Sequence, residues 1–176
     1  MKKELTKEVL MKETLMKNKK TGFEIYSSTF GDILIESDGK AITKVKLISK
    51  NGERPETRPD RQTTPDALTE KATRQLEEYF SGKRKKFDLP LDPHGTKFQS
   101  SVWKALLEIP YGETRSYKQI AQMIDNPKAC RAVGLANNKN PIWIIIPCHR
   151  VIGSDGSLTG YGGGLEMKQK LLEIER

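Results

Sequence analysis

Cys148 and His149 are the residues best suited to chemistry, and they follow Pro147 and an apolar run of five residues. A free thiol has a pKa of about 8.5, so a nucleophilic cysteine needs a base or a positive field at neutral pH. His149 can supply the base, and Arg150 adds positive charge. Because adjacent side chains on an extended strand point apart, His149 would act through a water molecule or a backbone bent at Pro147. Spacing alone leaves the plainer interpretation open, which is a small core cysteine beside a buried strand.

The composition is that of a basic chain without a membrane-spanning segment. Its 176 residues include 31 Lys and Arg against 23 Asp and Glu, a formal net charge of +8, and it has no apolar run long enough to span a bilayer. Two cysteines exclude a disulfide framework and favour a reducing compartment. Residues 1–20 carry acidic side chains and no continuous apolar segment, so we expect no secretory or transit peptide and a cytoplasmic location.

The positive charge is concentrated at the two ends of the chain. Residues 1–20 hold seven lysines against three glutamates, whereas residues 21–96 hold thirteen basic and thirteen acidic side chains. Residues 97–176 hold eleven basic and seven acidic side chains. The C-terminal surplus favours a polyanionic partner, bound through few phosphates and with a shallow salt dependence.

The first half of the chain has the pattern of strands. Three short alternating runs at 23–30, 32–37 and 41–49 are separated by glycine turns, which predicts an antiparallel meander. A polar, proline-bearing loop follows at 51–64.

A helix and a linker complete this half. The helix is predicted from apolar residues that recur every four positions and end at Ser81-Gly82, namely Leu68, Ala72, Leu76 and Phe80. The segment 83–95 has the composition of a linker. We therefore divide the chain into an appended tail or helix at 1–20, a strand-rich domain at 21–92 and a C-terminal domain at 93–176.

The second half is mainly helical in pattern. A first helix is predicted at 98–109, a second is capped by Ser116, and a third begins with Asn126 as cap and Pro127 as first helical residue and runs to about Asn137. Two short helices joined by a tight turn indicate a helix-turn-helix.

Three further segments close the chain. The apolar run 142–146 predicts a buried strand, residues 153–164 form a glycine-rich loop, and residues 165–174 predict a closing helix. The glycine-rich loop lacks the spacing of a phosphate-binding loop.

Several blocks of the second half resemble one known family. Pro147-Cys148-His149-Arg150-Val151 resembles the active-site signature of the O6-alkylguanine-DNA alkyltransferases, the methylated-DNA–protein-cysteine methyltransferases. Four more blocks resemble that family in order and spacing: Asn126-Pro127-Lys128, Arg131-Ala132-Val133-Gly134, Asn140-Pro141 and Tyr161-Gly162-Gly163-Gly164-Leu165. The resemblance covers 96–176 closely and 22–92 more loosely, and it does not cover 1–20.

The resemblance implies a fold and an activity. The fold is α/β of the α+β kind: an N-terminal antiparallel sheet with a helix, ribonuclease H-like, and a C-terminal helical DNA-binding domain with the helix-turn-helix. The activity is direct DNA repair, in which a methyl or small alkyl group moves from O6 of guanine, and less well from O4 of thymine, onto Cys148 in one irreversible step. It implies a single-turnover (suicide) enzyme without a cofactor, acting on double-stranded DNA as a monomer; cooperative assembly on DNA is left open.

The resemblance also implies catalytic roles. Cys148 is the alkyl acceptor, His149 deprotonates it through a water molecule, and Glu175 orients the imidazole. Asn140 is the hinge asparagine before the active-site segment. Tyr117 donates to the purine ring and crowds the phosphate of the flipped nucleotide.

The remaining implied residues bind DNA or line the lesion pocket. Arg131 is the arginine finger that fills the gap left by the flipped nucleotide, and Cys130 beside it is counted with the DNA-binding residues. The small helix face of Ala129, Ala132, Gly134 and Ala136 allows approach to the minor groove, although it could equally serve tight helix packing. The pocket residues are Trp143, Pro147, Val151, Tyr161, Gly162 and Gly163. Two depart from some relatives: Gly162 replaces a serine, and Trp143 replaces a proline and would restrict large alkyl groups.

Two other functions and a structural metal site are alternatives to compare with the sequence. Alkyltransferase-like proteins bind the same damage without repairing it and lack the acceptor cysteine, so Cys148 argues against that class. A Cys-His hydrolase would need an oxyanion hole and a substrate cleft that the sequence does not indicate. Two cysteines and two histidines, with Cys148 and His149 already assigned, leave too few ligands for a structural zinc, and we expect no metal.

Overall fold

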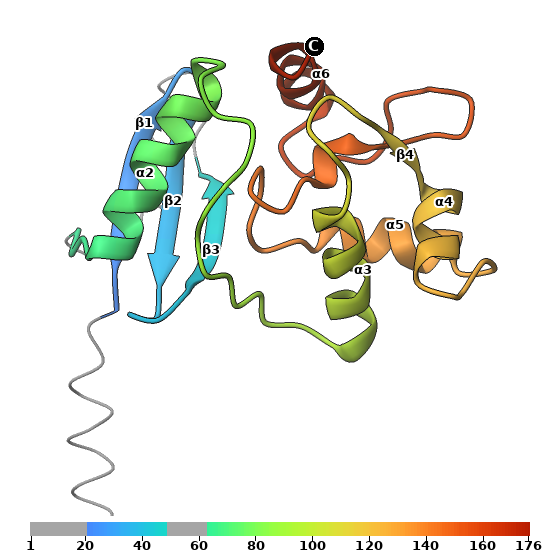
Figure 1. Cartoon of the computed structure of the whole chain (residues 1–176), viewed down its shortest axis with the longest axis horizontal. Helices are drawn as coiled ribbons and strands as arrows, with labels where there is room; N and C mark the ends of the chain where they lie inside the picture. Colours follow the sequence, from blue (N-terminus) through green and yellow to red (C-terminus); the bar gives the residue numbers. More distant parts are fainter. Residues whose placement is uncertain (1–20, 49–62) are drawn as a thin grey trace, which may run out of the picture.

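The N-terminal half is a three-stranded antiparallel sheet covered by one helix, as the sequence predicts. In the computed structural model, which describes residues 21–48 and 63–176, the sheet has the order β1-β2-β3. The strands are β1 (Phe23–Ser28), β2 (Gly31–Ser37) and β3 (Ile42–Leu47). Helix α2 (Ala67–Phe80) lies on one face of the sheet (Figure 1). The predicted tail at 1–20 and most of the predicted loop at 51–64 lie outside the described residues.

Helix α2 is held at both ends and buries a slightly different stripe from the predicted one. Asp66 caps its first turn in a capping box with Thr69, and Ser81 caps its end. Its fully buried side chains include Ala72, Leu76 and Tyr79, whereas Phe80 is only partly buried. The buried face therefore runs through Tyr79, which points this side chain towards the other half of the molecule.

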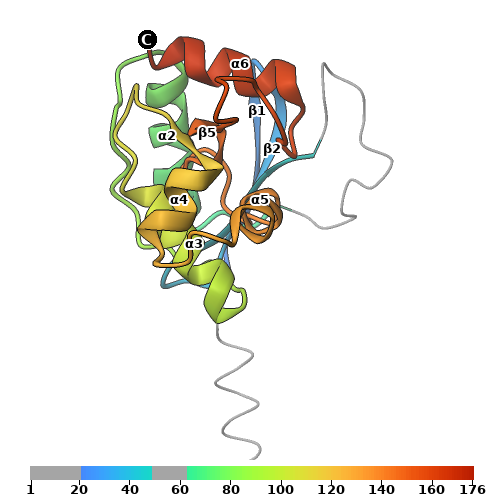
Figure 2. The same cartoon turned by 90° about the vertical axis from the view of Figure 1, so that its right-hand side faces the viewer.

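The C-terminal half is built from four helices and a short parallel pair of strands. Its elements are α3 (Lys97–Leu107), β4 (Arg115–Ser116), α4 (Tyr117–Met123), α5 (Cys130–Asn138), the 3-10 helix η1 (Cys148–Arg150), β5 (Val151–Ile152) and α6 (Leu165–Ile174). Helices α3 and α4 both pack against α5, which Figure 2 shows along its axis. Ser116 caps α4 with a capping box, and α6 occupies the predicted closing helix, so both predictions are confirmed.

Two sequence predictions in this half are wrong. The third helix does not begin at Asn126 and Pro127, because these residues form a turn in which the Asn126 carbonyl accepts from the Ala129 N–H, and α5 starts at Cys130. The run 142–146 is not a strand either. It is a buried turn in which the Ile146 N–H bonds to the Ile142 carbonyl at 3.0 Å. An apolar run this short has the same composition in a buried turn as in a buried strand.

Strand β3 joins the two halves along its outer edge. The linker lies beside it, since the Ile42 N–H donates to the Pro90 carbonyl and the Asp92 N–H donates to the Ile42 carbonyl. Further along, Val45 donates to the Pro141 carbonyl and accepts from the Trp143 N–H, both at 2.9 Å. The N-terminal sheet thus extends into the segment that precedes Cys148.

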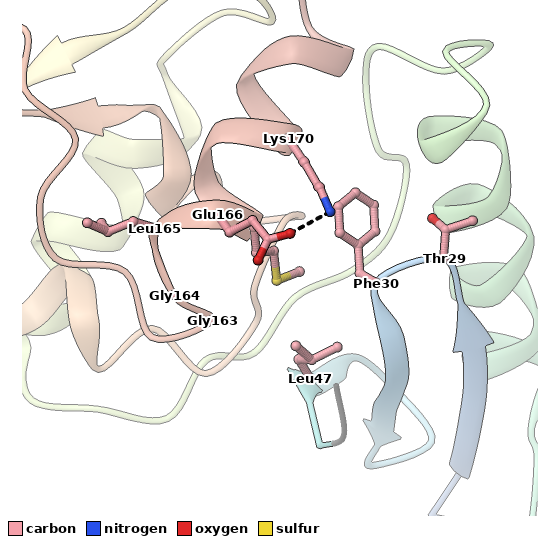
Figure 3. A pocket seen from close by; sticks show the side chains of 9 residues that line it. Thr29, Phe30, Leu47, Gly163, Gly164, Leu165, Glu166 and Lys170 are labelled. Atoms are coloured by element: carbon pink, nitrogen blue, oxygen red, sulfur yellow. Dashed lines mark hydrogen bonds and ion pairs between the residues drawn. The ribbon is translucent and has the colours of Figure 1, made fainter. Parts of the chain in front are cut away.

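The halves also meet around a pocket of about 220 Å3 at the start of α6. Figure 3 shows Phe30 of the β1–β2 turn and Leu47 of β3 on one side of this pocket, and Glu166 and Lys170, whose side chains form an ion pair at 2.7 Å, on the other. Among the described residues no helix is both long and apolar enough to cross a membrane.

Candidate active site

A buried turn closed by Asn140 presents Cys148. The Asn140 side chain donates from Nδ2 to the Ile146 carbonyl and accepts from the Ile142 N–H, both at 2.9 Å. Ile144, at the tip of the turn, has a φ of 71°, a conformation that costs a β-branched residue free energy. The clamp at Asn140 holds this strained backbone and directs the chain into η1.

The 3-10 turn η1 gives Cys148 and His149 a geometry that an extended strand would not. Pro147 precedes this turn, and its carbonyl accepts from the Arg150 N–H at 3.0 Å. The backbone is therefore bent at Pro147, which was one of the two expectations from the sequence. Both side chains are buried, with Cys148 only 2% exposed and His149 fully enclosed.

Glu175, which caps the end of α6, is the centre of a buried hydrogen-bond network. Its Oε1 lies 2.8 Å from Nε2 of His149 and accepts from the Tyr79 hydroxyl at 2.6 Å. Arg150 donates to both carboxylate oxygens, from Nε at 2.8 Å and from Nη2 at 2.9 Å. The Gly112 N–H donates to Oε2 at 3.2 Å. The structure thus brings Glu175 to His149, and five donors hold one carboxylate.

This network fixes the protonation of the histidine. Burial alone would raise the pKa of Glu175, but the bonds from His149 and Arg150 hold it well below its ordinary value, so the carboxylate stays charged. Burial lowers the pKa of His149, against the opposing effect of Glu175. A neutral imidazole facing a carboxylate carries its proton on Nε2, which leaves Nδ1 as an acceptor. Nδ1 is buried and bonds to none of the described residues.

The thiol needs this base. Burial raises the pKa of Cys148 to about 11, although Asn140 and the charge of Lys168 act in the opposite direction. The thiol is therefore protonated at neutral pH until an acceptor takes its proton. The Arg150 guanidinium is engaged by Glu175 and by the Ile109 carbonyl, so the cation that stabilises the thiolate is Lys168.

A cavity of about 850 Å3 lies between α4, α5 and the glycine-rich loop. Tyr117 from α4, Arg131 and Gly134 from α5, and Tyr161 from the loop all line it. The Tyr117 hydroxyl donates to the Thr159 carbonyl at 3.1 Å. The structure thus places Tyr161 beside residues expected to bind DNA, whereas the other expected pocket residues do not line this cavity.

The exposed face of α5 contains only part of the predicted small-residue face. Ala132 is exposed and Gly134 partly so, but Ala136 is buried in the core at 2% exposure. Arg131 and Leu135 are exposed on the cavity side, and Leu135 is 66% exposed. Sequence spacing did not predict which residues of α5 face outward, because the helix begins at Cys130 and not at Asn126.

Comparisons with known proteins show the family of the chain. The family model described as "6-O-methylguanine DNA methyltransferase, DNA binding domain" matches residues 97–176, and the model of the same family's ribonuclease-like domain matches residues 23–93. The chain belongs to the 6-O-methylguanine DNA methyltransferase family. DNA is accordingly the partner of its C-terminal half.

Relatives of the chain are named methylated-DNA–protein-cysteine methyltransferases. A methylated-DNA–protein-cysteine methyltransferase from Methanosarcina acetivorans is 52% identical over 87% of this chain and 97% of its own length. One from Mycobacterium tuberculosis is 48% identical over 88% of this chain and 92% of its own. The crystal structure of M. tuberculosis OGT in complex with DNA has a TM-score of 0.77 and 48% identity, covering 87% of this chain and 91% of that one.

Gly162 and Trp143, the two residues expected to depart from the family pattern, lie against each other. A Cβ atom on Gly162 would lie 2.6 Å from Cζ2 of Trp143, closer than van der Waals contact allows. The indole is fixed because its N–H donates to the Asn140 carbonyl at 2.9 Å. With Trp143 in this place, a serine at residue 162 would have to displace the indole.

Three residues of this family member's site were missed by sequence reasoning. Asn137 donates from Nδ2 to the Cys148 carbonyl at 3.3 Å, and Tyr79 bonds to Glu175. The buried Lys168 ammonium donates to the carbonyls of Val151 and Thr159. Tyr79 and Lys168 are in helical phase with buried leucines of α2 and α6, a signal that the sequence does contain.

Pro147, Val151 and Gly163 are all buried, and Gly163 lines the pocket at the start of α6. Cys130 lies at the start of α5 with its Sγ 3.7 Å from the Pro127 carbonyl, beside the cavity. Within the described residues no group of three or more His, Cys, Asp or Glu side chains could hold a metal ion.

Proposed function

We propose that the chain repairs O6-alkylguanine in double-stranded DNA by accepting a methyl or small alkyl group on Cys148. O4-alkylthymine would be a poorer substrate. The observation that carries this proposal is the buried series Cys148, His149 and Glu175, in which the histidine has one nitrogen bound to Glu175 and the other unoccupied by any described residue. A protonated thiol beside a neutral, oriented imidazole is the arrangement that nucleophilic displacement requires.

The proposed step balances without a cofactor. Nδ1 of His149 takes the proton of the Cys148 thiol, with a water molecule as the bridge. The sulfur attacks the alkyl carbon, a sulfur–carbon bond forms, and the bond from that carbon to O6 breaks. The electron pair stays on the base, which takes up a proton and becomes ordinary guanine. The thioether is stable, so each molecule acts once.

The leaving oxygen and the purine ring need donors as well. Residue 162 offers no hydroxyl, so we assign the leaving oxygen to backbone N–H groups of the Tyr161–Gly163 segment. The Tyr117 hydroxyl would exchange its bond to the Thr159 carbonyl for the purine ring. Burial raises the pKa of Tyr117, which keeps it protonated and able to donate.

Access to the thiol requires a flipped nucleotide. Cys148 is 2% exposed and an alkyl group on O6 lies inside the base stack, so neither can reach the other while the duplex is intact. Arg131 is exposed beside the cavity and is suited to fill the gap in the stack. Exposed lysines near α5 can contact phosphates, and they are Lys118, Lys128 and Lys139. We assign α5 to the minor groove, with the protein acting as a monomer.

Mass spectrometry tests the proposal directly. The protein is mixed with a duplex oligonucleotide that contains one O6-methylguanine, and intact and peptide masses are recorded over time. We expect the mass of one methyl group on the peptide that contains Cys148, at a stoichiometry of one per molecule. Cys148→Ser should remain unmodified, whereas Cys130→Ser should be modified like the wild type.

Two other outcomes would contradict the proposal. Tight binding of the lesion without modification would indicate a damage marker, and a methyl group on Cys130 would assign the wrong thiol. For the DNA contact, Arg131→Ala should slow transfer from duplex DNA while the free base O6-methylguanine reacts as before. Unchanged repair of the duplex would contradict the role of Arg131.

A further inference from the structure

Tyr79 reaches the catalytic network from the other half of the molecule. It lies near the end of α2, and its hydroxyl donates to Oε1 of Glu175 at 2.6 Å across a sequence separation of 96 residues. The same hydroxyl is 3.4 Å from Nε2 of His149. Oε1 of Glu175 therefore accepts the hydrogen bond of the Tyr79 hydroxyl next to the His149 imidazole.

The side chain is rigidly held in this position. Tyr79 is fully buried, and its ring packs against Phe87 and Tyr111 with centroid distances of 5.4 and 6.3 Å. Burial, followed by the charge of Glu175, raises the pKa of Tyr79 far above its ordinary value. The hydroxyl is thus a neutral donor at neutral pH.

We propose that Tyr79 is a positioning residue for alkyl transfer: its hydroxyl fixes the Glu175 carboxylate and limits how strongly that carboxylate attracts a proton onto His149. The inference rests on the proposed function, because it assigns His149 as the base. It also gives the N-terminal half a part in the chemistry of the C-terminal half.

The expected effect on His149 follows from the charges around it. The imidazole faces Glu175 and Lys168 from α6 and its cap, Arg150 from η1, and Tyr79 from α2. A hydrogen bond from Tyr79 disperses part of the negative charge on Oε1. Without that bond, the carboxylate stabilises a protonated imidazole more strongly, so the pKa of His149 rises. A protonated histidine cannot accept the thiol proton, and the acid limb of the transfer rate moves to higher pH.

Tyr79→Phe and Tyr111→Phe form a matched pair. Each substitution removes one hydroxyl from the same aromatic cluster and keeps the ring. The Tyr111 hydroxyl donates to the carbonyl of Ile174, in the last turn of α6, at 2.7 Å. Both variants therefore lose one short bond to the same end of the same helix, but only Tyr79→Phe loses a donor to Glu175.

Two measurements are made on both variants and on the wild type. The first is the single-turnover rate of methyl transfer as a function of pH. The second is a titration of the imidazole nitrogens by NMR, which is simple to assign because the chain has two histidines and His94 is exposed. His94 serves as the internal reference.

We expect Tyr79→Phe to lower the transfer rate at neutral pH by about tenfold, as for the loss of one hydrogen bond to a charged group. Its acid limb and the pKa of His149 should both shift upwards, with His94 unchanged. Tyr111→Phe should move neither. If Tyr79→Phe slows transfer without moving the acid limb or the His149 titration, Tyr79 is a structural residue only and the inference is wrong.

The NMR titration separates this inference from the proposed function. If the wild type transfers no methyl group, the function fails, while the response of His149 to Tyr79→Phe still decides the present inference. If Tyr79→Phe does not fold, the wild type provides the test. Its Tyr79 hydroxyl proton should exchange slowly and show a nuclear Overhauser effect to the His149 ring, and absence of that signal overturns the inference.

Discussion

The two ring nitrogens of His149 lie in opposite surroundings. Nε2 faces Glu175, a carboxylate that accepts from five donors. Nδ1 is equally buried but has no partner among the described residues. Of the five buried side-chain polar atoms that lack a partner in the described segments, three belong to residues around the thiol, namely Asn137, His149 and Tyr161.

The difference separates two demands on a catalytic base. A histidine must be held in one orientation and one tautomer, and the network at Glu175 does this with bonds from both halves of the chain. It must also keep hydrogen-bonding capacity for the reaction, and native proteins leave buried polar atoms unpaired at few other places. We call the Nε2 side of His149, bound to Glu175, the saturated side and the Nδ1 side the open side. The saturated side should therefore determine the free energy of unfolding, and the open side should determine the rate of alkyl transfer.

The largest effect should come from removing the base with His149→Gln. The amide can still donate to Glu175, so the fold should be retained. Transfer at neutral pH should slow by about a hundredfold or more, because a thiol whose pKa is about 11 stays protonated. The remaining rate should rise about tenfold per pH unit below that pKa, as measured by single-turnover transfer.

His94→Gln is the control for this variant, since His94 is exposed and distant from the network. Its pH profile should match the wild type. A remaining rate in His149→Gln that does not depend on pH would mean that another group deprotonates Cys148.

Glu175→Ala tests the saturated side. It leaves Arg150 buried without its counter-ion, and we expect a loss of about 3–5 kcal/mol in the free energy of unfolding, measured with urea. Glu173→Ala, an exposed change two residues earlier, should cost far less. The pKa of Glu175 is depressed in the fold, so its contribution is present above the unfolded carboxyl pKa and declines as pH falls. If the difference in the free energy of unfolding between the wild type and Glu175→Ala grows as pH falls, this role of Glu175 is contradicted.

Lys168→Met tests the cation whose charge favours the Cys148 thiolate. The change removes both bonds that hold the carbonyls of Val151 and Thr159, together with the positive charge that favours the thiolate. Transfer should slow by about tenfold. Lys170→Met, on the exposed face of the same helix, should transfer at the wild-type rate. Equal rates in both variants would show that Lys168 is dispensable.

The smallest effect is expected from Gly162→Ser, which places a Cβ atom against Trp143. Overpacking of this kind costs about 1–3 kcal/mol. In a double-mutant cycle with Trp143→Leu, the serine should cost less when the indole is absent. Four urea-unfolding curves measure the cycle, and strictly additive costs would mean that the two residues do not compensate.

Local signals in the sequence predicted much of the fold. Ser116 caps α4 because its side chain accepts from the Gln119 N–H, a bond that depends only on neighbouring residues. The meander and α6 were equally readable from their periodicity. Asn126-Pro127 misled, because the same dipeptide suits a turn and a helix start, and Asp125 before it has a φ of 55°.

The catalytic network depends on contacts that no local pattern specifies. The family signature located Cys148 and His149, and the resemblance placed Glu175 with them. The helical phase of α2 contains a signal for the burial of Tyr79, but no local pattern indicates its role, because its partner lies 96 residues away. Lys168 was missed because a lysine in a helix is normally exposed, and here two backbone carbonyls compensate its burial.

The position of Glu175 has a consequence for the order of folding. Its partners at residues 79 and 112 are separated from it by 96 and 63 residues, and contacts of such separation form late because loop closure precedes them. A partly folded chain therefore holds Cys148 as an ordinary thiol with no oriented base. The base-assisted transfer proposed for Cys148 therefore depends on the completed tertiary structure, because only there does His149 have its orientation.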